Sequence, residues 1–116
     1  MSKQTLLKRG DTIQVQVDVL LFEEYGSFVA YCPALELSSY GDDQSDAKKA
    51  FDGAMKIFIK ETTTKGTLEK YLLKLGWHLQ QKPKMVYQPP TFSIQESKRF
   101  LHKNPTIYNE RVAMPA

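Results

Sequence analysis

The sequence is poor in the residues that build disulfides and metal sites. It contains one cysteine, Cys32, which cannot form an intramolecular disulfide, so a reducing compartment, the cytoplasm, is the expected location. The two histidines, His78 and His102, lie far from each other and from Cys32 along the chain, which does not match zinc-ligand spacing. A glycine-rich phosphate loop is also missing, so we expect neither a metal nor a cofactor.

Long apolar runs and a strong net charge are missing as well. Near the N-terminus only Leu6 and Leu7 are consecutive apolar residues, so no secretory or membrane-spanning segment is expected. The 116 residues suffice for one domain, and 41% hydrophobic and 25% charged side chains are typical of a globular protein. The net charge of +3 is unevenly divided: residues 1–80 carry ten basic and eleven acidic side chains, and residues 81–116 carry six and two.

Alternating apolar and polar residues predict three strands in the first part of the chain. Residues 12–24 alternate with a period of two, which is typical of a strand with one buried face. A short polar turn leads to a second strand over residues 28–32, which Pro33 ends because proline has no N–H to donate. A third strand, over residues 35–40, ends at a turn at Gly41. The short connections predict an antiparallel meander.

An amphipathic helix is predicted after the meander. Asp43 can accept from its first free N–H groups, and Asp42 is a further acidic residue suited to a cap at the positive end of the helix dipole. Apolar residues recur at spacings of three and four, which predicts one buried face made of Ala47, Ala50, Phe51, Ala54, Met55, Phe58 and Ile59. A short second helix over residues 67–75 and an edge strand over residues 77–80, returning to the meander, are expected to follow.

Prolines divide residues 81–116 into short pieces. We therefore expect residues 1–80 to form one α+β domain: a three-stranded antiparallel meander, an amphipathic helix packed on one face, a short second helix and a fourth edge strand (β-β-β-α-α-β). Residues 81–116 are expected to form an irregular, basic extension that is not an independent domain. Within it, residues 106–112 alternate weakly, as a late edge strand would.

The acidic residues do not predict a catalytic site. Two-metal hydrolysis of a phosphodiester requires several carboxylates that converge on one point. Here Asp42, Asp43 and Asp46 are explained by a turn and a helix start, and Glu23 and Glu24 by a solvated hairpin. Cys32 has no adjacent base that would activate it as a nucleophile, so the sequence predicts a protein that is not an enzyme.

The large side chains exceed what one small sheet and one helix need for a core. They include Leu20, Phe22, Tyr31, Tyr40, Tyr87, Phe92 and Phe100. One interpretation is an interface with another protein, and the other is that the C-terminal extension covers this surface within the monomer. The basic residues of the extension indicate an alternative function, that of a nucleic-acid-binding or regulatory protein that acts through this extension. They are Lys82, Lys84, Lys98, Arg99, Lys103 and Arg111.

Three sequence features together resemble the HicB-like antitoxin domain over roughly residues 11–80. They are the segment Tyr25-Gly-Ser-Phe-Val-Ala-Tyr-Cys-Pro-Ala-Leu35, the turn Tyr40-Gly41-Asp42, and Ala47 and Ala50 on the following helix. The resemblance implies a truncated ribonuclease H-like fold without the catalytic acids. It also implies an antitoxin that binds and blocks a small HicA-like RNA-cleaving toxin and that forms a homodimer or a larger assembly.

Many members of that family also carry a C-terminal DNA-binding module, and this sequence departs from that pattern. After Pro90 too few residues remain for a ribbon-helix-helix, and Pro105 falls where its second helix would begin, so direct DNA binding is not expected. The candidate partner-binding residues are the aromatic side chains of Phe22, Tyr31 and Tyr40. Structural roles are expected for Pro33, Gly41, Asp42, Asp43, Ala47 and Ala50.

Overall fold

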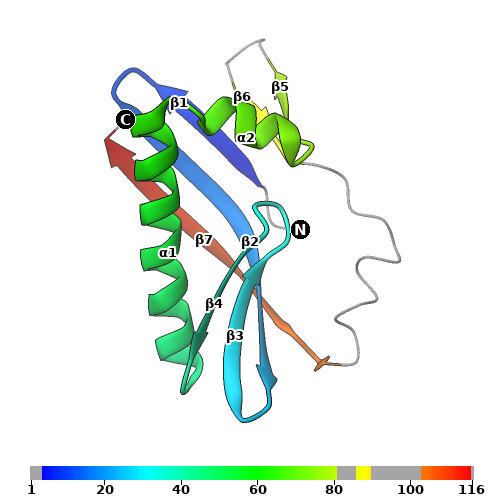
Figure 1. Cartoon of the computed structure of the whole chain (residues 1–116). Coiled ribbons are helices and arrows are strands. Elements are labelled where there is room, and N and C mark those ends of the chain that lie inside the picture. The colour runs from blue at the N-terminus through cyan, green and yellow to red at the C-terminus, as the bar shows by residue number, and fades with distance from the viewer. Residues whose placement is uncertain (1–3, 81–85, 90–102, 116) are drawn as a thin grey trace.

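The strand β2 (Thr12–Glu24) is the centre of the fold. The computed structural model describes residues 4–80, 86–89 and 103–115. The other elements are, in chain order, β1 (Thr5–Arg9), β3 (Ser27–Cys32), β4 (Leu37–Gly41), α1 (Gln44–Lys65), α2 (Leu68–Lys74), β5 (His78–Gln80), β6 (Val86–Gln88) and β7 (Thr106–Pro115). The described strands form one antiparallel sheet with two helices, so the predicted α+β class and the meander β2-β3-β4 are confirmed (Figure 1).

Both edges of β2 carry neighbouring strands. Gln16 pairs with both β1 and β7, and Leu20 pairs with both β3 and β7, so β1 and β3 share one edge of β2 while β7 occupies the other. Between β1 and β3 a gap remains on the shared edge, where the backbone N–H of Asp18 donates to Oε1 of Gln4 at 2.9 Å. Beyond β1 the sheet continues through β6 to β5, and beyond β3 it ends at β4.

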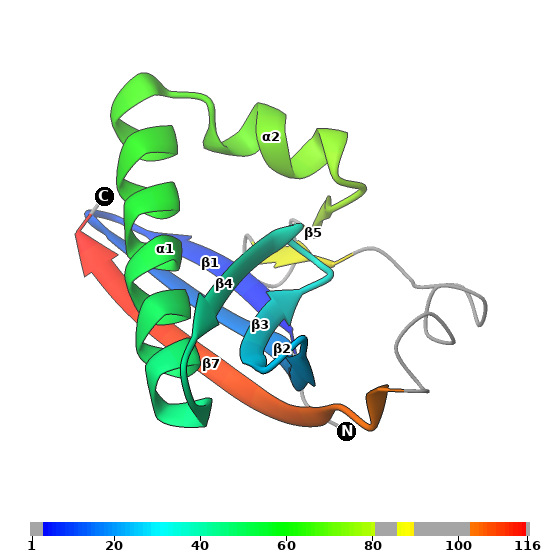
Figure 2. The same cartoon turned by 60° about the horizontal axis from the view of Figure 1, so that its bottom comes forward.

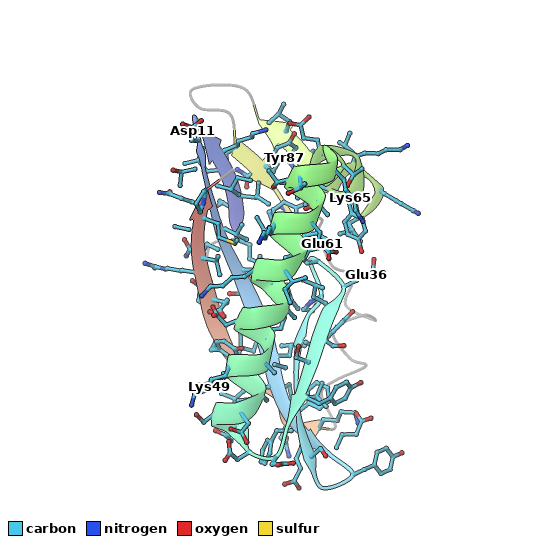
Figure 3. All side chains as sticks on the ribbon, turned by 60° about the vertical axis from the view of Figure 1, so that its left-hand side comes forward. Asp11, Glu36, Lys49, Glu61, Lys65 and Tyr87 are labelled. Carbon is cyan, nitrogen blue, oxygen red and sulfur yellow. The ribbon has the colours of Figure 1, made fainter. Side chains whose placement is uncertain are left out.

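The helix α1 covers one face of this sheet, and the buried core lies between them (Figure 2). Every second residue of β2 from Ile13 to Leu21 is buried, as the period of two predicts. These side chains meet the buried stripe of α1, which consists of Ala47, Phe51, Met55 and Ile59. The opposite side of α1 is solvent-exposed, with Lys49, Glu61 and Lys65 along it (Figure 3).

The junction between β4 and α1 follows the sequence prediction closely. Asp43 is the N-cap of α1, and its Oδ1 accepts from the backbone N–H of Asp46 at 2.8 Å. The side chain of Asp42 is exposed, and the cap comes from its neighbour. Gly41 lies so close to the first turn of α1 that an added Cβ would overlap the backbone nitrogen of Ala47 and approach the carbonyl carbon of Asp46 to 2.6 Å.

The prediction that Ala50 lies on the buried face of α1 is wrong, since its side chain is exposed. The buried stripe advances in steps of four residues, and Ala50 is rotated from Phe51 by one residue, about 100° around the helix axis. Its carbonyl oxygen still contributes to packing, since it accepts from Oγ of Ser39 on β4 at 3.3 Å. Pro33 directly follows the last residue of β3, which confirms its predicted place at a strand end.

The core extends around Trp77 to the end of the sheet that contains β1, β6 and β5. The indole Nε1 of Trp77, which is buried, donates to the carbonyl oxygen of Ala34 at 2.8 Å and so ties the loop after β3 to the end of α2. Helix α2 lies over this end of the sheet, where Lys8 and Glu69 approach to 4.0 Å (Figures 1 and 2). The prediction that the strand at residues 77–80 returns to the meander is wrong, since β5 pairs with β6.

The C-terminal part of the chain requires a second correction. Residues 106–115 are not irregular: they form β7, which pairs with β2 over ten consecutive positions from Thr12↔Pro115 to Leu21↔Thr106. The weak alternation over residues 106–112 therefore indicated a strand correctly. The sheet also gains β1 and β6, which no sequence pattern predicted, and both β6 and β7 join strands that precede residue 80.

Two glycine substitutions provide a test of the packing between β4 and α1. Gly41→Ala should lower the free energy of unfolding by about 1–3 kcal/mol, because its methyl group would meet backbone atoms that cannot rotate away. Gly53→Ala is the matched control: apart from its chain neighbours and the backbone of α1, no described atom lies within 4 Å of the added Cβ, so it should stabilise the protein by about 1 kcal/mol. Urea unfolding of both variants measures the difference, and equal effects would contradict the described junction.

Candidate functional site

The three aromatic residues predicted to contact a partner lie on one face of the sheet. Phe22 pairs with Val29, and Val29 pairs with Tyr40, so these side chains form a row across β2, β3 and β4. The next row contains Tyr31 opposite Leu20. We call the sheet face that carries them the outer face.

The outer face is the one opposite α1. Ser39, which neighbours Tyr40 on β4, bonds to the backbone of α1, and successive side chains of a strand point to opposite faces. Across β2, Ile107 of β7 lies opposite Leu20 and therefore on this face too. The outer-face cluster thus consists of Leu20, Phe22, Val29, Tyr31, Tyr40 and Ile107.

Exposure within the outer-face cluster is greatest at its two sides. Phe22 and Val29 are buried, with 6% and 5% of their surface exposed, and Leu20 and Tyr31 are half-buried. Tyr40 and Ile107 are 66% and 61% exposed. Three strand spacings separate β4 from β7, so these two side chains are about 14 Å apart perpendicular to the strands, and they lie in neighbouring rows. Of the three predicted aromatic contacts, Tyr40 is the one that the fold leaves most accessible.

A charged pair borders the cluster beside Phe22. Nζ of Lys103 lies 2.8 Å from Oε2 of Glu24 and 5.4 Å from the centre of the Phe22 ring. Both charged side chains are partly buried, so this ion pair and cation–π contact attach the residues just before β7 to the end of β2. Sequence patterns gave no sign of this contact, because 79 positions separate its two residues.

The other half of the outer face is polar. Nδ2 of Asn109 donates to Oδ1 of Asp18 at 3.2 Å and to the carbonyl oxygen of Val17 at 3.3 Å. Nε of Arg111 donates to Oδ1 of Asn109 at 3.4 Å. The outer face therefore joins an apolar half, the cluster, to a hydrogen-bonded half centred on Asn109.

A carboxyl pair lies on the helix-covered face, between β7 and α1. Burial, followed by the negative charge of Asp52, raises the pKa of Glu110, whose carboxyl is within hydrogen-bonding reach of Asp52. Asp52 also forms an ion pair with Lys56 at 2.9 Å. The hydroxyl group of Tyr108 nearby is buried and has no hydrogen-bond partner among the described residues, and burial raises its pKa well above the ordinary value. The sequence did not predict this cluster, because it gave residues 106–112 no packing partner.

The remaining candidate groups do not converge on a reactive centre. Burial raises the pKa of the Cys32 thiol to about 12, so it stays protonated at neutral pH. Asp43 is used as a helix cap and Glu24 in an ion pair. Within residues 4–80, 86–89 and 103–115, no group of three or more His, Cys, Asp or Glu side chains is arranged to hold a metal ion. In the same part of the chain no helix is both long and apolar enough to span a membrane.

The basic residues of the C-terminal part are only partly described. Lys103 is paired with Glu24, and Arg111 lies on the outer face beside Asn109. The other members of the predicted basic set lie outside the described residues, as does His102: they are Lys82, Lys84, Lys98 and Arg99. His78 is exposed on β5.

Comparison of the chain with sequence models of protein families, with curated protein sequences and with solved structures gave no match.

The Glu110–Asp52 pair makes stability depend on pH in a defined direction. Because the folded state raises the pKa of Glu110, it binds that proton more tightly than the unfolded chain does. The free energy of unfolding should therefore fall as pH rises from the ordinary carboxyl pKa through the raised value. Glu110→Gln should remove this fall in the free energy of unfolding and make the protein more stable at neutral pH. Glu61→Gln, the same change on an exposed part of α1, is the control, and urea unfolding across this pH range is the measurement.

Proposed function

We propose that this chain is a protein-binding module of the HicB-like antitoxin type, which neutralises a small HicA-like RNA-cleaving toxin by covering its active surface. The observation that carries this proposal is the outer face, where the exposed Tyr40 and Ile107 lie at opposite ends of two neighbouring rows of buried and half-buried apolar side chains. Aromatic side chains supply much of the binding energy of protein interfaces, and an apolar centre with a polar rim is the usual arrangement.

The placement of the motif residues supports the same proposal. The segment that resembles the family, residues 25–35, includes β3 and the loop that Trp77 holds through the Ala34 carbonyl. Gly41 and Ala47 meet at the β4–α1 junction, where only a residue without a side chain fits at position 41. These residues therefore have structural roles in a β-β-β-α unit, and on the neighbouring outer face Tyr40 and Ile107 are the side chains most accessible to a partner.

The proposed action is by binding and not by catalysis. The acidic residues with described roles cap a helix, form ion pairs or hold β7, and Cys32 is a buried, protonated thiol. A protein that acts on an RNA-cleaving toxin would work in the cytoplasm, and a chain with one unpaired cysteine suits that reducing compartment.

Co-expression tests the function directly. The full chain is produced together with a small HicA-like protein encoded beside its gene, and cell growth and recovery of a stoichiometric complex are measured. We expect rescue of growth and a stable complex. A folded, toxic neighbour that is neither bound nor neutralised would overturn the proposal.

Substitution of Tyr40 tests the outer face. Tyr40→Asp should weaken the complex by roughly tenfold or more, because it removes an accessible aromatic contact and places a charge in an apolar interface. Tyr25→Asp is the matched control, since Tyr25 is 99% exposed in the turn between β2 and β3. Calorimetric titration with the toxin measures both affinities. Equal affinities of the two variants would exclude the outer face as the binding surface.

A further inference from the structure

β7 is a long strand with one described neighbour. It has ten residues and pairs with β2 along its whole length, while its other edge faces away from the described strands. The strands that end the sheet elsewhere are shorter, since β4 has five residues and β5 has three. Proteins usually keep edge strands short or interrupt them, because unpaired N–H and C=O groups are a template for another strand.

The direction of the backbone groups of β7 follows from one hydrogen bond. The N–H of Asp18 donates to Gln4 on the β1 side of β2, so Asp18 and its partner Asn109 form a non-hydrogen-bonded pair. The N–H and C=O groups of Asn109 therefore point away from β2. Since this direction alternates along an antiparallel strand, the same holds for Ile107, Arg111 and Ala113. Pro115 is the next residue whose backbone groups point away from β2. Its lack of an N–H therefore removes no hydrogen bond between β7 and β2.

We propose that the free edge of β7 pairs with β7 of a second copy of this chain, antiparallel about a two-fold axis at Glu110. One continuous sheet then runs through both copies. In this register Ile107 lies opposite Ala113 of the second copy, and Asn109 lies opposite Arg111 of the second copy. All the outward N–H and C=O groups of the four residues find partners. The dimer covers Ile107, which also belongs to the outer-face cluster, whereas Tyr40 lies on β4 at another edge of the sheet.

The side chains of β7 favour a second copy as the occupant. Between described residues, neither Asp18 nor Arg111 forms an ion pair, although both belong to the polar half of the outer face. In the dimer, Arg111 of the second copy lies directly beyond Asn109, in the row that starts at Asp18. The guanidinium group can thus reach the Asp18 carboxylate, and the two-fold axis repeats this contact. The exposed side chains of Ile107 and Ala113 cover each other twice.

Neighbouring registers are poorer. With the axis at Arg111, two arginines face each other and Ile107 faces Pro115, which lacks an N–H. With the axis at Asn109, the apolar Ile107 faces the charged Arg111. The proposed register has one unfavourable pair, Glu110 opposite Glu110 on the helix-covered face, where α1 contributes Asp52 and Lys56. Glu110→Gln should therefore tighten the dimer.

Oligomeric state is the first test. Light scattering of the full chain over a concentration series should give the mass of a dimer that dissociates on dilution, and a monomer at every concentration would overturn the proposal. Ile107→Lys should raise the dissociation constant at least tenfold. Ile57→Lys is its matched control, because Ile57 is 59% exposed on α1, and it should leave the dimer unchanged. Circular dichroism confirms that both variants fold.

Cysteine cross-linking tests the register. Glu110→Cys, Asn109→Cys and Arg111→Cys each place one thiol at the axis of a different register, while the native Cys32 is buried. Under mild oxidation, Glu110→Cys should form the disulfide-linked dimer fastest. Faster linkage of either other variant would overturn the register. A dimer in which none of the three variants cross-links would overturn pairing through β7.

Discussion

The sheet depends on the ability of β2 to pair along both edges at once. Its first five residues lie between β1 and β7, and Leu20 and Leu21 lie between β3 and β7. The same strand presents an unbroken row of buried side chains to α1. Every described strand is connected to β2 directly or through one or two neighbours, so the two halves of the sheet are held together by this one strand.

This arrangement also explains why the two faces differ. On one face α1 and α2 cover the apolar residues. Ser39 of β4 donates to a carbonyl of α1, and Trp77 after α2 donates to a carbonyl in the loop after β3. The outer face receives no described helix. Its apolar and polar halves adjoin because β7 brings Ile107 next to Leu20 and Asn109 next to Asp18. The candidate site is thus a product of pairing between distant segments.

Local features of the sequence predicted the local parts of the structure. The alternation over residues 12–24, the Asp43 cap and the end of β3 before Pro33 depend on neighbouring residues, and all were predicted. Strand β1 was not, because Leu6 and Leu7 are adjacent and show no period of two. Its formation requires pairing with β2 and β6, which no local pattern encodes.

The candidate site was predicted in part for the same reason. The period of two along adjacent strands places Phe22, Tyr31 and Tyr40 on one face of the sheet, but it does not predict how exposed each side chain is. Tyr40 is accessible because it lies on the last strand of the meander, whereas Phe22 is enclosed near Lys103, a residue distant in sequence. The roles of Ile107 and Glu110 depend on the pairing of β7 with β2, which the sequence pattern did not predict.

The pairing of β2 with β7 has a consequence for the order of events during synthesis. Even its shortest loop, from Leu21 to Thr106, spans 85 positions, so β2 leaves the ribosome several seconds before β7 at ordinary translation rates of about 5–20 residues per second. The meander and α1 can form in that interval from local contacts. Until the C-terminal strand arrives, the nascent chain carries the long edge of β2 uncovered, and folding must tolerate that exposed backbone.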